Sequence, residues 1–557
     1  MKIIYRYKWL ILTVSIFGIT GISWKILQPE PKPASDLFEI KKNLDIFHDV
    51  YSKVEELYVD EPEPGKLMLK GIDAMLASLD PYTNFIPESK MEDYRFMSTG
   101  AYGGIGALIG SYKGDIIISE IYEGNPAHIG GLMAGDIIKE IDGKSVENKS
   151  QSDISEFLKG QPDTEVEIKV KREGTDELIK TTLIRKKVKI PDVPYYTIIE
   201  DKVGYVKLNS FTQTAASEVM DAYSDLVNQG MEKFILDLRG NGGGLLIEAV
   251  KIVNMFVEKG QEVVSMRGRI ENTNKIYQTL DRPVDLAIPL VVIVDEGSAS
   301  ASEIVSGSLQ DLDRAVIVGT RTYGKGLVQQ TRDIKYNSKI KITIAKYYTP
   351  SGRCIQKLDY SNKENGQATK VPDSLITEFK TKNGRPVFDG NGIEPDITIE
   401  PEVYSNLLVA LISKRIIFSY ATLYRLNNDS IGPAKQFKLT EEDFKDFKSF
   451  VLKQDFEYIN KSLKQLEILK EVSENEKYTE DIQNELKILE QKLTPQLSVD
   501  IDRFKDKILL TLENEIISRY YYQKGRMVNA LKEDIFLKEA IKILNMRSDY
   551  NRVLGNP

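Results

Sequence analysis

The chain has 557 residues, of which 41% are hydrophobic and 28% charged, a balance typical of globular domains and not of global disorder. A chain of this length accommodates about three or four domains of ordinary size. Its formal net charge of −8 argues against a nucleic-acid-binding protein, because phosphate binding requires a clustered basic surface.

Two scarce residue types narrow the possible chemistry. Cys354 is the only cysteine, so the chain forms no intrachain disulfide and no cysteine-based zinc or iron–sulfur site. His48 and His128 are the only histidines, which excludes an HExxH metal site. Both histidines lie far in sequence from the best candidate nucleophile. If the protein is a hydrolase, we therefore expect a general base other than histidine.

Residues 1–27 predict export of the chain. Lys2, Arg6 and Lys8 precede an uncharged apolar run of about 16 residues at 9–24, which is short for a membrane span of ~20 and long enough for a signal core of ~7–15. The basic residues keep the N-terminus in the cytoplasm. No Ala-x-Ala cleavage site follows, so we favour an uncleaved membrane anchor over a cleaved signal peptide. A buried core helix is the third alternative.

The pattern then changes twice along the chain. Residues 28–97 contain a Pro-rich polar linker followed by apolar residues at helical spacing, and Asp80-Pro81 breaks that helical pattern into a loop. Residues 98–188 combine glycine-rich turns with strand-like runs such as 116–118 and the alternating segment 166–172. They predict a small β-rich domain of about 90 residues.

Residues 189–400 alternate strands and helices, and residues 401–557 are helical and charged with few glycines. The expected strands are 203–208, 234–238, 290–294 and 315–318, and the expected helix is 216–228. Apolar strands interleaved with helices predict an α/β domain whose sheet is covered on both faces. The C-terminal part predicts an all-α packing or assembly domain.

The densest chemical signal follows the strand at 290–294. The run Ser298-Ala-Ser300-Ala-Ser302 opens a predicted helix, whose first backbone N–H groups lack internal partners and can stabilise an oxyanion. Ordinary N-cap serines are the alternative. No GxSxG pattern surrounds these serines, so the nucleophile elbow of the α/β-hydrolases is not indicated.

Lys325 lies between two glycines after the strand at 315–318. Burial against the backbone would lower its pKa, and a neutral lysine can accept a proton from a serine. A solvated surface lysine is the alternative. Residues 319–325 also satisfy GxxxxGK, but position 326 is glycine where a nucleotide-binding loop needs Ser or Thr for Mg²⁺, which disfavours that interpretation.

A third feature is the glycine-rich segment at 240–244, which follows the strand at 234–238. Glycine permits the close approach of a substrate backbone, and an N–H group here would serve as a second oxyanion donor. A flexible turn is the alternative. A dinucleotide-binding GxGxxG loop is disfavoured, because the register is wrong and no acidic ribose partner is evident.

Together these motifs resemble the carboxyl-terminal processing peptidases, also called tail-specific proteases, over residues 37–400. The matching motifs are Leu79-Asp80-Pro81, Gly104-Ile105-Gly106, Asp237-Leu-Arg-x-Asn-x-Gly-Gly244, Ser298-Ala-Ser-Ala-Ser-Glu303, Gly324-Lys-Gly-x-Val-Gln329, Tyr348-Thr-Pro-Ser-Gly-Arg353 and Gly392-Ile-x-Pro-Asp396. The chain departs from the family at Gly240 and Gly242, since the family often has proline in this loop, and the extra glycine makes the loop more mobile.

The resemblance implies a multidomain α/β protein with a ClpP/crotonase-like α/β protease core, an inserted β-rich PDZ domain, an N-terminal helical region and a C-terminal all-α domain. It implies that Ser300 is the nucleophile, that Lys325 is the general base and that Gln329 orients the lysine. Asp311 matches an acidic position proposed as a third member of this set. The implied mechanism needs no histidine, cofactor or metal, in agreement with the histidine count.

The resemblance further implies an oxyanion hole formed by the N–H groups of Ala301 and Gly243. It makes residues 98–188 a PDZ module, which binds an extended peptide by strand addition and captures its C-terminal carboxylate. Arg172 would couple peptide binding to activation, and an exposed strand residue is the alternative. The implied carboxylate loop consists of Tyr102, Gly103, Gly104, Ile105 and Gly106.

The expected function is a serine endopeptidase that cleaves exported proteins near or from their C-terminal tails. The expected partners are proteins or peptides with apolar C-terminal tails and the membrane, through residues 9–24; a homo-oligomer is left open. The expected location is the bacterial periplasm or the outer face of the inner membrane. A catalytically silent PDZ scaffold and a nucleotide-binding protein are the alternatives.

Overall fold

The computed structural model describes residues 34–364, 366–458 and 460–555, so the predicted anchor at 9–24 lies outside the described residues. The chain divides into two compact units, with the boundary between Ser78 and Leu79. Within the described residues, no single helix is long and apolar enough to cross a membrane. One bent pair, Asn406–Ser413 with Ile416–Asn427, passes that test by length and composition alone.

The described part of the first unit consists of two helices, α2 (Ala34–Leu57) and α3 (Pro64–Ala77), as the helical spacing predicted. The hydroxyl of Tyr51 donates to the carbonyl of Pro64 at 2.9 Å and joins the two. Much of the apolar face of α2 is exposed to solvent, with Leu44 62% exposed.

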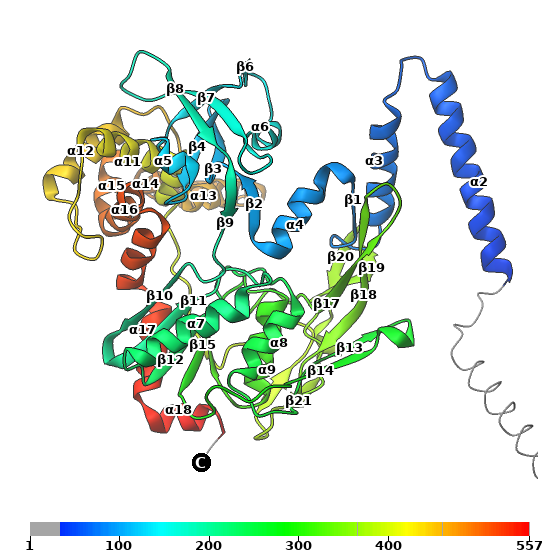
Figure 1. The fold of residues 1–557 in the computed structure, drawn as a ribbon. Coiled ribbons are helices and arrows are strands. Elements are labelled where there is room, and N and C mark those ends of the chain that lie inside the picture. Colours follow the sequence, from blue (N-terminus) through cyan, green and yellow to red (C-terminus); the bar gives the residue numbers. More distant parts are fainter. Residues whose placement is uncertain (1–33, 365, 459, 556–557) are drawn as a thin grey trace, which may run out of the picture. The chain divides into compact units, whose positions relative to one another are not determined.

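The second unit contains a mixed six-stranded sheet, the core sheet, in the order β10-β11-β12-β15-β16-β23 (Figure 1). Its strands are β10 (Tyr195–Ile199), β11 (Val203–Lys207), β12 (Lys233–Asp237), β15 (Leu290–Val294), β16 (Val316–Gly319) and β23 (Ile397–Thr398). β10 runs antiparallel to β11, and the other pairs are parallel. The four strands predicted from apolar runs are therefore confirmed.

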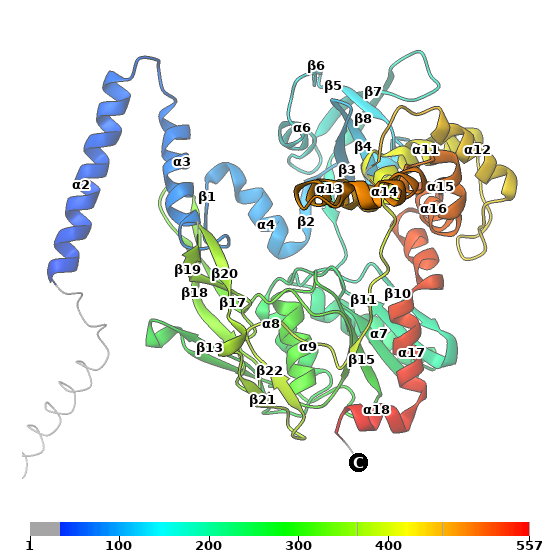
Figure 2. The ribbon, with the colours of Figure 1, turned by 180° about the vertical axis from the view of Figure 1, so that it is seen from behind.

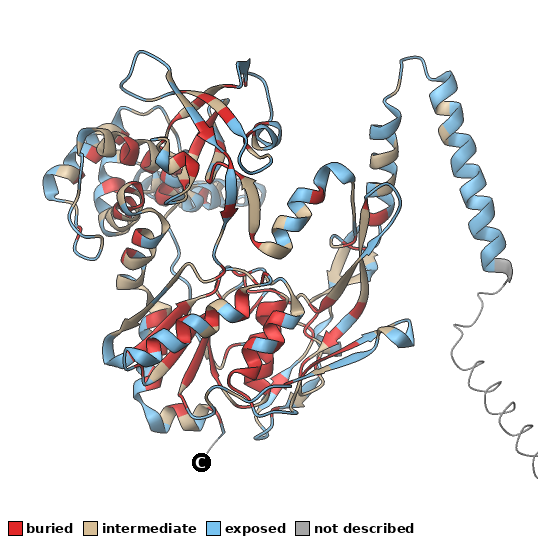
Figure 3. Ribbon diagram, viewed as in Figure 1, coloured by how far each residue is buried: buried red, intermediate tan, exposed pale blue. Residues whose placement is uncertain are grey.

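Helices cover both faces of the core sheet. The covering helices are α7 (Ala215–Asn228), α8 (Leu246–Asn254) and α9 (Ala301–Asp311) on one face, and α17 (Ile535–Asn545) and α18 (Arg547–Val553) on the other. Successive side chains of a strand point to opposite faces, so Val292 joins the first of these cores and Val291 the second. Figure 3 shows the buried strands of the core sheet between these layers, and it shows α9, within one of the layers, as buried too. The predicted two-sided cover is confirmed, and one of its layers comes from the end of the chain.

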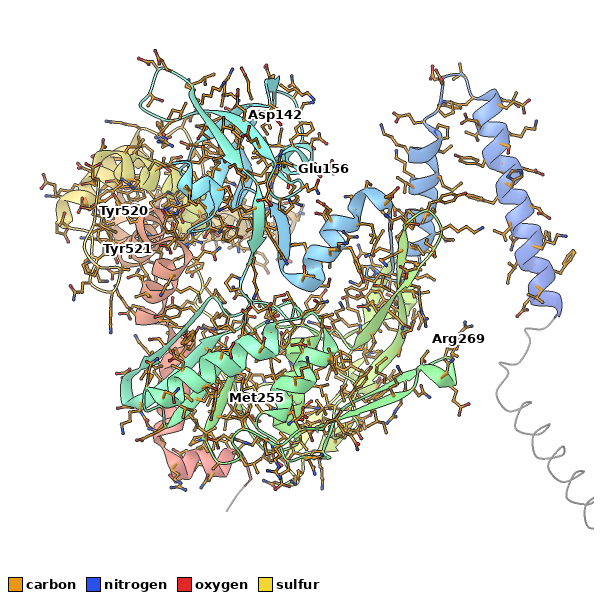
Figure 4. All side chains as sticks on the ribbon, in the orientation of Figure 1. Asp142, Glu156, Met255, Arg269, Tyr520 and Tyr521 are labelled. Carbon is orange, nitrogen blue, oxygen red and sulfur yellow. The ribbon has the colours of Figure 1, made fainter. Side chains whose placement is uncertain are left out.

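A five-stranded antiparallel sheet adjoins this core, and sequence patterning did not predict it. Its strands are β1 (Asn84–Ile86), β13 (Glu262–Gly268), β14 (Lys275–Gln278), β17 (Leu327–Asp333) and β18 (Lys339–Tyr348). β18 pairs with β1, β13 and β17. Figure 4 labels Arg269 in the turn between β13 and β14, and Met255, which is buried after α8.

The predicted β-rich domain is confirmed as a sheet in the order β3-β4-β5-β7-β8, with β6 beside β5. Its elements are β3 (Ala107–Tyr112), β4 (Asp115–Ile121), α5 (Pro126–Ile129), β5 (Ile137–Ile141), β6 (Lys144–Ser145), α6 (Gln151–Leu158), β7 (Glu165–Lys171) and β8 (Ile179–Ile184). Strands β2 (Ala101–Gly104) and β9 (Lys186–Lys189) pair where the chain enters and leaves this domain. Helix α4 (Met91–Thr99) precedes β2, and the short helix η1 (Glu88–Lys90) precedes α4.

Small elements complete the second unit before its helical part. They are η2 (Glu200–Lys202), η3 (Glu271–Thr273), β19 (Leu358–Glu364), β20 (Gln367–Lys370), η4 (Asp373–Leu375), β21 (Glu378–Lys380) and β22 (Pro386–Phe388). Strand β19 pairs with β20, and β21 pairs with β22, so each pair forms a two-stranded sheet.

The residues after 401 are helical, as predicted. Their helices before α17 are α10 (Asn406–Ser413), α11 (Ile416–Asn427), α12 (Glu441–Leu452), α13 (Lys461–Asn475), α14 (Thr479–Leu493), α15 (Leu497–Arg503), α16 (Lys505–Ala530) and η5 (Leu531–Glu533). Leu411, Phe447 and Ile516 belong to a hydrophobic core that α10, α11, α12, α15 and α16 share. From α16 the chain continues into α17 beside the core sheet, a path that is visible from behind in Figure 2.

Candidate active site

A cavity of about 730 Å³ brings together most of the residues that the motifs singled out. Ser300, Ala301, Lys325, Gln329 and Gly243 all line it. Among its described lining residues there is no histidine, which agrees with the expectation that a histidine base is not used.

Ser300 lies in the turn between β15 and α9, at the N-terminus of the helix. Its backbone has φ 56° and ψ −111°, a region that non-glycine residues rarely occupy. Such strain persists only where the surroundings fix it, and it occurs most often at functional sites. The sequence lacks GxSxG, yet the chain places this serine on a sharp, strained strand-to-helix turn.

The loop of residues 240–244, here called the glycine loop, packs directly against this turn. A Cβ on Gly243 would lie 2.7 Å from the carbonyl oxygen of Ala299 and 2.9 Å from the backbone nitrogen of Ala301, at a φ of +97°. Only glycine fits this position. The N–H group of Gly243 donates to Oδ1 of Asn241 at 2.9 Å, so it must exchange that partner before it can hold an oxyanion.

Lys325 presents its amine to the cavity without a hydrogen bond to Ser300 among the described residues. Its Nζ lies 4.2 Å from the centre of the Tyr82 ring, a cation–π contact. Burial, together with the positive charge of Lys341, lowers the pKa of Lys325 to about 8 against the opposing effects of Glu303 and Asp80. A neutral amine is therefore available near neutral pH.

Gln329 lies on β17, shortly after Lys325 in the chain. Its Nε2 donates to Oγ1 of Thr343 at 3.2 Å, and the N–H group of Thr343 donates to Oγ1 of Thr83 at 3.1 Å. The described structure thus engages the Gln329 amide with β18 and not with Lys325. The predicted contact between Gln329 and Lys325 is not formed in this arrangement.

Glu303 ends one of the matching motifs, but the sequence analysis assigned it no role at the site. Its buried carboxylate accepts the N–H groups of Ser300 at 2.8 Å, Gly324 at 2.7 Å and Lys325 at 2.9 Å. The hydroxyl of Thr322 donates to it at 2.6 Å. Burial raises the pKa of Glu303, and these four donors oppose that rise. An acidic residue three positions after the helix N-cap was the available signal.

Asp311 lies away from this chemistry. It ends α9, whose N-terminus carries Ser300, and 11 residues at ~1.5 Å each separate the two by roughly 16 Å along the helix. Its carboxylate is buried and accepts the guanidinium of Arg353 at 2.8 Å and the N–H group of Ser351 at 3.0 Å. This ion pair gives Asp311 a structural environment, and Asp311 does not line the cavity.

The predicted carboxylate loop spans β2 and the turn before β3. The carbonyls of Ile105 and Gly106 accept the N–H groups of Ala127 and Tyr122 at 2.8 and 3.0 Å, so the turn is anchored inside the β-rich domain. β3 follows as an edge strand of its sheet, and an edge strand is what strand addition requires.

Arg172 follows β7 and is largely buried, unlike an exposed strand residue. Its Nε and one terminal nitrogen donate to the two oxygens of Asp136 at 2.7 and 2.8 Å. The same terminal nitrogen donates to the carbonyl of Gly131 at 2.8 Å. Arg172 thus holds the turn before β5, and its coupling role stays a prediction.

Helix α4 connects the carboxylate loop to the cavity. Phe96 lines the cavity, and its ring meets the ring of Tyr102 edge to face at 5.3 Å. Asp93 pairs with Lys159 of the β-rich domain at 2.6 Å. One short helix therefore joins the predicted carboxylate loop to the cavity wall.

Three family models match the chain: Peptidase family S41 over residues 202–361, PDZ domain over 117–172, and the C-terminal helical domain of probable PDZ-proteases over 407–544. The carboxy-terminal-processing protease of Bartonella bacilliformis is 34% identical over 319 residues, 57% of this chain and 73% of that protein. The chain belongs to peptidase family S41. It is a serine-type peptidase of the carboxy-terminal-processing family with a PDZ domain and a C-terminal helical domain, which confirms the predicted resemblance.

Two further relatives are similar to this family member. A probable CtpA-like serine protease of Staphylococcus aureus is 31% identical over 371 residues, which is 66% of this chain and 67% of that protein. Among solved structures, the photosystem II D1 C-terminal processing protease is 28% identical and covers 65% of this chain and 94% of its own, with a TM-score of 0.36.

Proposed function

We propose that this family member is a serine endopeptidase with a Ser300–Lys325 dyad, which cleaves exported proteins near or from their C-terminal tails. One observation carries the proposal: a strained serine at a helix N-terminus and a lysine of lowered pKa line the same cavity. The carboxylate of Glu303 joins the backbones of both residues. Export rests on the apolar segment at 9–24.

The chemistry proceeds in two halves. The Oγ of Ser300 attacks the scissile carbonyl while neutral Lys325 accepts its proton, and the N–H groups of Ala301 and Gly243 hold the oxyanion. Lys325 then returns the proton to the leaving amine, which departs and leaves the acyl-enzyme. Water attacks the ester with Lys325 again as base, and Ser300 regains its proton.

The described arrangement requires the N–H group of Gly243 to exchange Oδ1 of Asn241 for the oxyanion, and it requires two side chains to move first. The Nζ of Lys325 must turn from the ring of Tyr82 towards Ser300, and the Gln329 amide must exchange Thr343 for the lysine. Both existing contacts are weak single interactions, worth about 0.5–1 kcal/mol each, so the binding of a substrate can displace them.

The PDZ domain supplies the recognition of tails in this proposal. An extended tail would pair with the edge strand β3 and place its carboxylate at residues 102–106. Its apolar residues match the cavity wall, which includes Phe85, Ile86, Phe96 and Met97. Helix α4 provides a route from the loop to the cavity, and Arg172 would act within the same domain.

The domain assignment and location belong to the same proposal. The parallel strands β11, β12, β15 and β16 with helices on both faces support a ClpP/crotonase-like core. We assign the N-terminal helical region to 28–97, the PDZ domain to 98–188, the peptidase core to 189–400 and the helical domain to 401–557. The protein would act in the periplasm or at the outer face of the inner membrane.

The test compares the full chain in detergent with Ser300→Ala and Lys325→Ala on an unfolded protein that has an apolar C-terminus, followed by intact mass. Ser217→Ala and Lys335→Ala are matched controls, because both residues are exposed and outside the cavity. We expect the wild type and both controls to cut and the two dyad variants to bind without cutting. If no protein cuts and all bind, the silent scaffold replaces this proposal; if either dyad variant cuts at the wild-type rate, the dyad is wrong.

A further inference from the structure

The glycine loop is held from its far side by a residue of the C-terminal helical segment. Arg239, immediately before Gly240, donates through Nη1 to Oδ1 of Asp534 at 3.0 Å and through Nη2 to Oδ2 at 2.6 Å. Its Nε and Nη2 also contact Asp237 of β12, at 3.1 and 2.5 Å. The carboxylates of Asp237 and Asp534, nearly 300 residues apart in sequence, thus both accept hydrogen bonds from the guanidinium of Arg239.

The charges of this cluster balance only when Asp534 is present. Lys207 approaches Asp237 at 3.2 Å, so two cations and two carboxylates meet within the cluster. Arg239 is 20% exposed, and Asp237 and Asp534 are 1% and 11% exposed. Neutralising Asp534 leaves two cations sharing a single carboxylate in a site largely shielded from water, an unfavourable arrangement.

Arg239 is also tied to the nucleophile by its neighbours in the chain. The N–H group of Gly240 donates to Oδ1 of Asp295 at 2.8 Å, and the carbonyl of Asn241 accepts the N–H group of Ala299 at 3.0 Å. The same carbonyl accepts the hydroxyl of Ser302 at 2.8 Å. A shift of Arg239 would therefore displace the glycine loop, against which the turn of Ser300 packs.

The segment that carries Asp534 also reaches the PDZ domain. Asp534 caps α17, which packs on the core sheet, and it follows α16. On α16, Arg526 pairs with Glu120 of β4 at 3.5 Å, and the ring of Tyr522 meets His128 at 5.0 Å. Tyr520 and Tyr521, labelled in Figure 4, donate to the backbone of residues 428–432 and fix α16 within the helical domain.

We propose that Asp534 is a positioning residue of the peptidase: by holding Arg239 it sets the glycine loop against the Ser300 turn, so the C-terminal helical segment is part of the catalytic machinery. This inference rests on the proposed role of Ser300 and of the glycine loop. It gives the C-terminal segment a function that its packing alone does not. Asp534 touches no reacting atom, and it acts through Arg239.

Two substitutions separate this role from the capping of α17. The N–H groups of Phe536 and Leu537 donate to Oδ1 of Asp534 at 2.9 and 3.1 Å, and asparagine caps a helix as well as aspartate does. Asp534→Asn therefore keeps the cap and removes the charge that holds Arg239. Asp534→Glu keeps the charge and weakens the cap.

The experiment measures kcat and KM of the full chain with the same unfolded substrate, together with the thermal unfolding of each variant. We expect Asp534→Asn to lower kcat about tenfold with KM within about twofold. The reason is that a displaced glycine loop slows the chemical step more than it weakens substrate binding. Asp534→Glu should retain more activity than Asp534→Asn. Asp549→Asn is the matched control, because Asp549 pairs with the exposed side chain of Arg552 within α18, does not line the cavity and should leave kcat unchanged.

The outcomes distinguish the possible roles. Wild-type kcat in Asp534→Asn, or more activity in Asp534→Asn than in Asp534→Glu, overturns the proposal, since a role in capping alone gives that order. If Asp534→Asn fails to fold, Asp534→Glu decides: at least half the wild-type kcat supports the charge, and a tenfold loss overturns it. Ser300→Ala in the same assay must be inactive; if it cuts, the proposed dyad fails, whatever the result at Asp534.

Discussion

The turn that carries Ser300, the proposed nucleophile, and the segment that carries Lys325, the proposed base, are held in different ways. The strained backbone of Ser300 is fixed by Glu303 and by the glycine loop, which is itself anchored from the far side by Arg239. The Nζ of Lys325 lies over the ring of Tyr82 and forms no hydrogen bond to Ser300 among the described residues, and the Gln329 amide donates to Thr343. The comparison contrasts a proposed nucleophile that is held in place with a proposed base that must still turn towards it, while the N–H group of Gly243 must first release Oδ1 of Asn241.

We expect the largest loss of activity and stability from a substitution of Glu303, because its carboxylate binds the backbones of both Ser300 and Lys325. In Glu303→Gln one oxygen is replaced by an NH₂ group that faces backbone donors, so one or more buried N–H groups lose their acceptor. We expect a loss of about 2–4 kcal/mol in the free energy of unfolding and at least a hundredfold loss of kcat/KM. Denaturant unfolding and steady-state kinetics measure both. Glu258→Gln, at an exposed position, is the control, and equal effects in the two variants would contradict the role of Glu303.

The next largest effect is expected at Gly243, where the glycine loop packs against the Ser300 turn. Gly243→Ala places a Cβ against Ala299 and Ala301 at a φ of +97°, which displaces the glycine loop from the Ser300 turn. We expect kcat to fall about a hundredfold with a small change in KM. Gly242→Ala is the matched control, because its Cβ enters open space, and it should lose far less activity. Similar kcat values for the two variants would show that the close packing at Gly243 does not matter.

The base predicts a pH dependence with a definite sign. Because only neutral Lys325 accepts a proton and its pKa is about 8, kcat/KM should rise with pH through about 8 and level off above it. Lys341→Met removes a like charge from the cavity and should shift the midpoint to higher pH. Other charged groups near the base are Asp80, Glu303 and the cavity residues Lys90 and Asp93. A profile that is flat from about pH 6 to 9 would contradict this base.

The smallest effect concerns the release of Gln329. Thr343→Val keeps the shape of the side chain and removes the hydroxyl that accepts the Gln329 amide. If that bond holds the amide away from the lysine, its loss should raise kcat by about two- to fivefold, the equivalent of about 0.5–1 kcal/mol. A decrease in kcat would show that Thr343 supports the working arrangement instead.

Sequence patterning predicted the elements whose signal is local. The strands of the core sheet are short apolar runs, and the helix at 216–228 has a continuous apolar face that ends at Gly230. Each of these patterns can be recognised from a short stretch of neighbouring residues. The serine and lysine were found because their motifs place them at a strand-to-helix turn and between glycines. The resemblance to a family then supplied Gln329 and the oxyanion donors.

Features that depend on distant segments were not accessible in this way. The cover of one sheet face by α17 and α18 joins residues more than 200 positions apart, and no local periodicity reports it. The contact of Tyr82 with Lys325 and the charge of Lys341 in the cavity arise from the antiparallel sheet, whose strands were not predicted. No sequence pattern singled out Asp534, because its partner Arg239 lies nearly 300 residues earlier in the chain.

The most direct test of the account is the titration of Lys325 itself. Isotope-labelled lysine in the Ser300→Ala protein, with Lys325→Arg to assign the signal, gives its pKa by NMR without turnover. We predict a value near 8, well below the ordinary lysine value of about 10.4, which makes neutral Lys325 available as the base. A titration at the ordinary value would contradict the central claim, because only about one amine in 2,500 would then be neutral at pH 7, compared with about one in ten at a pKa near 8.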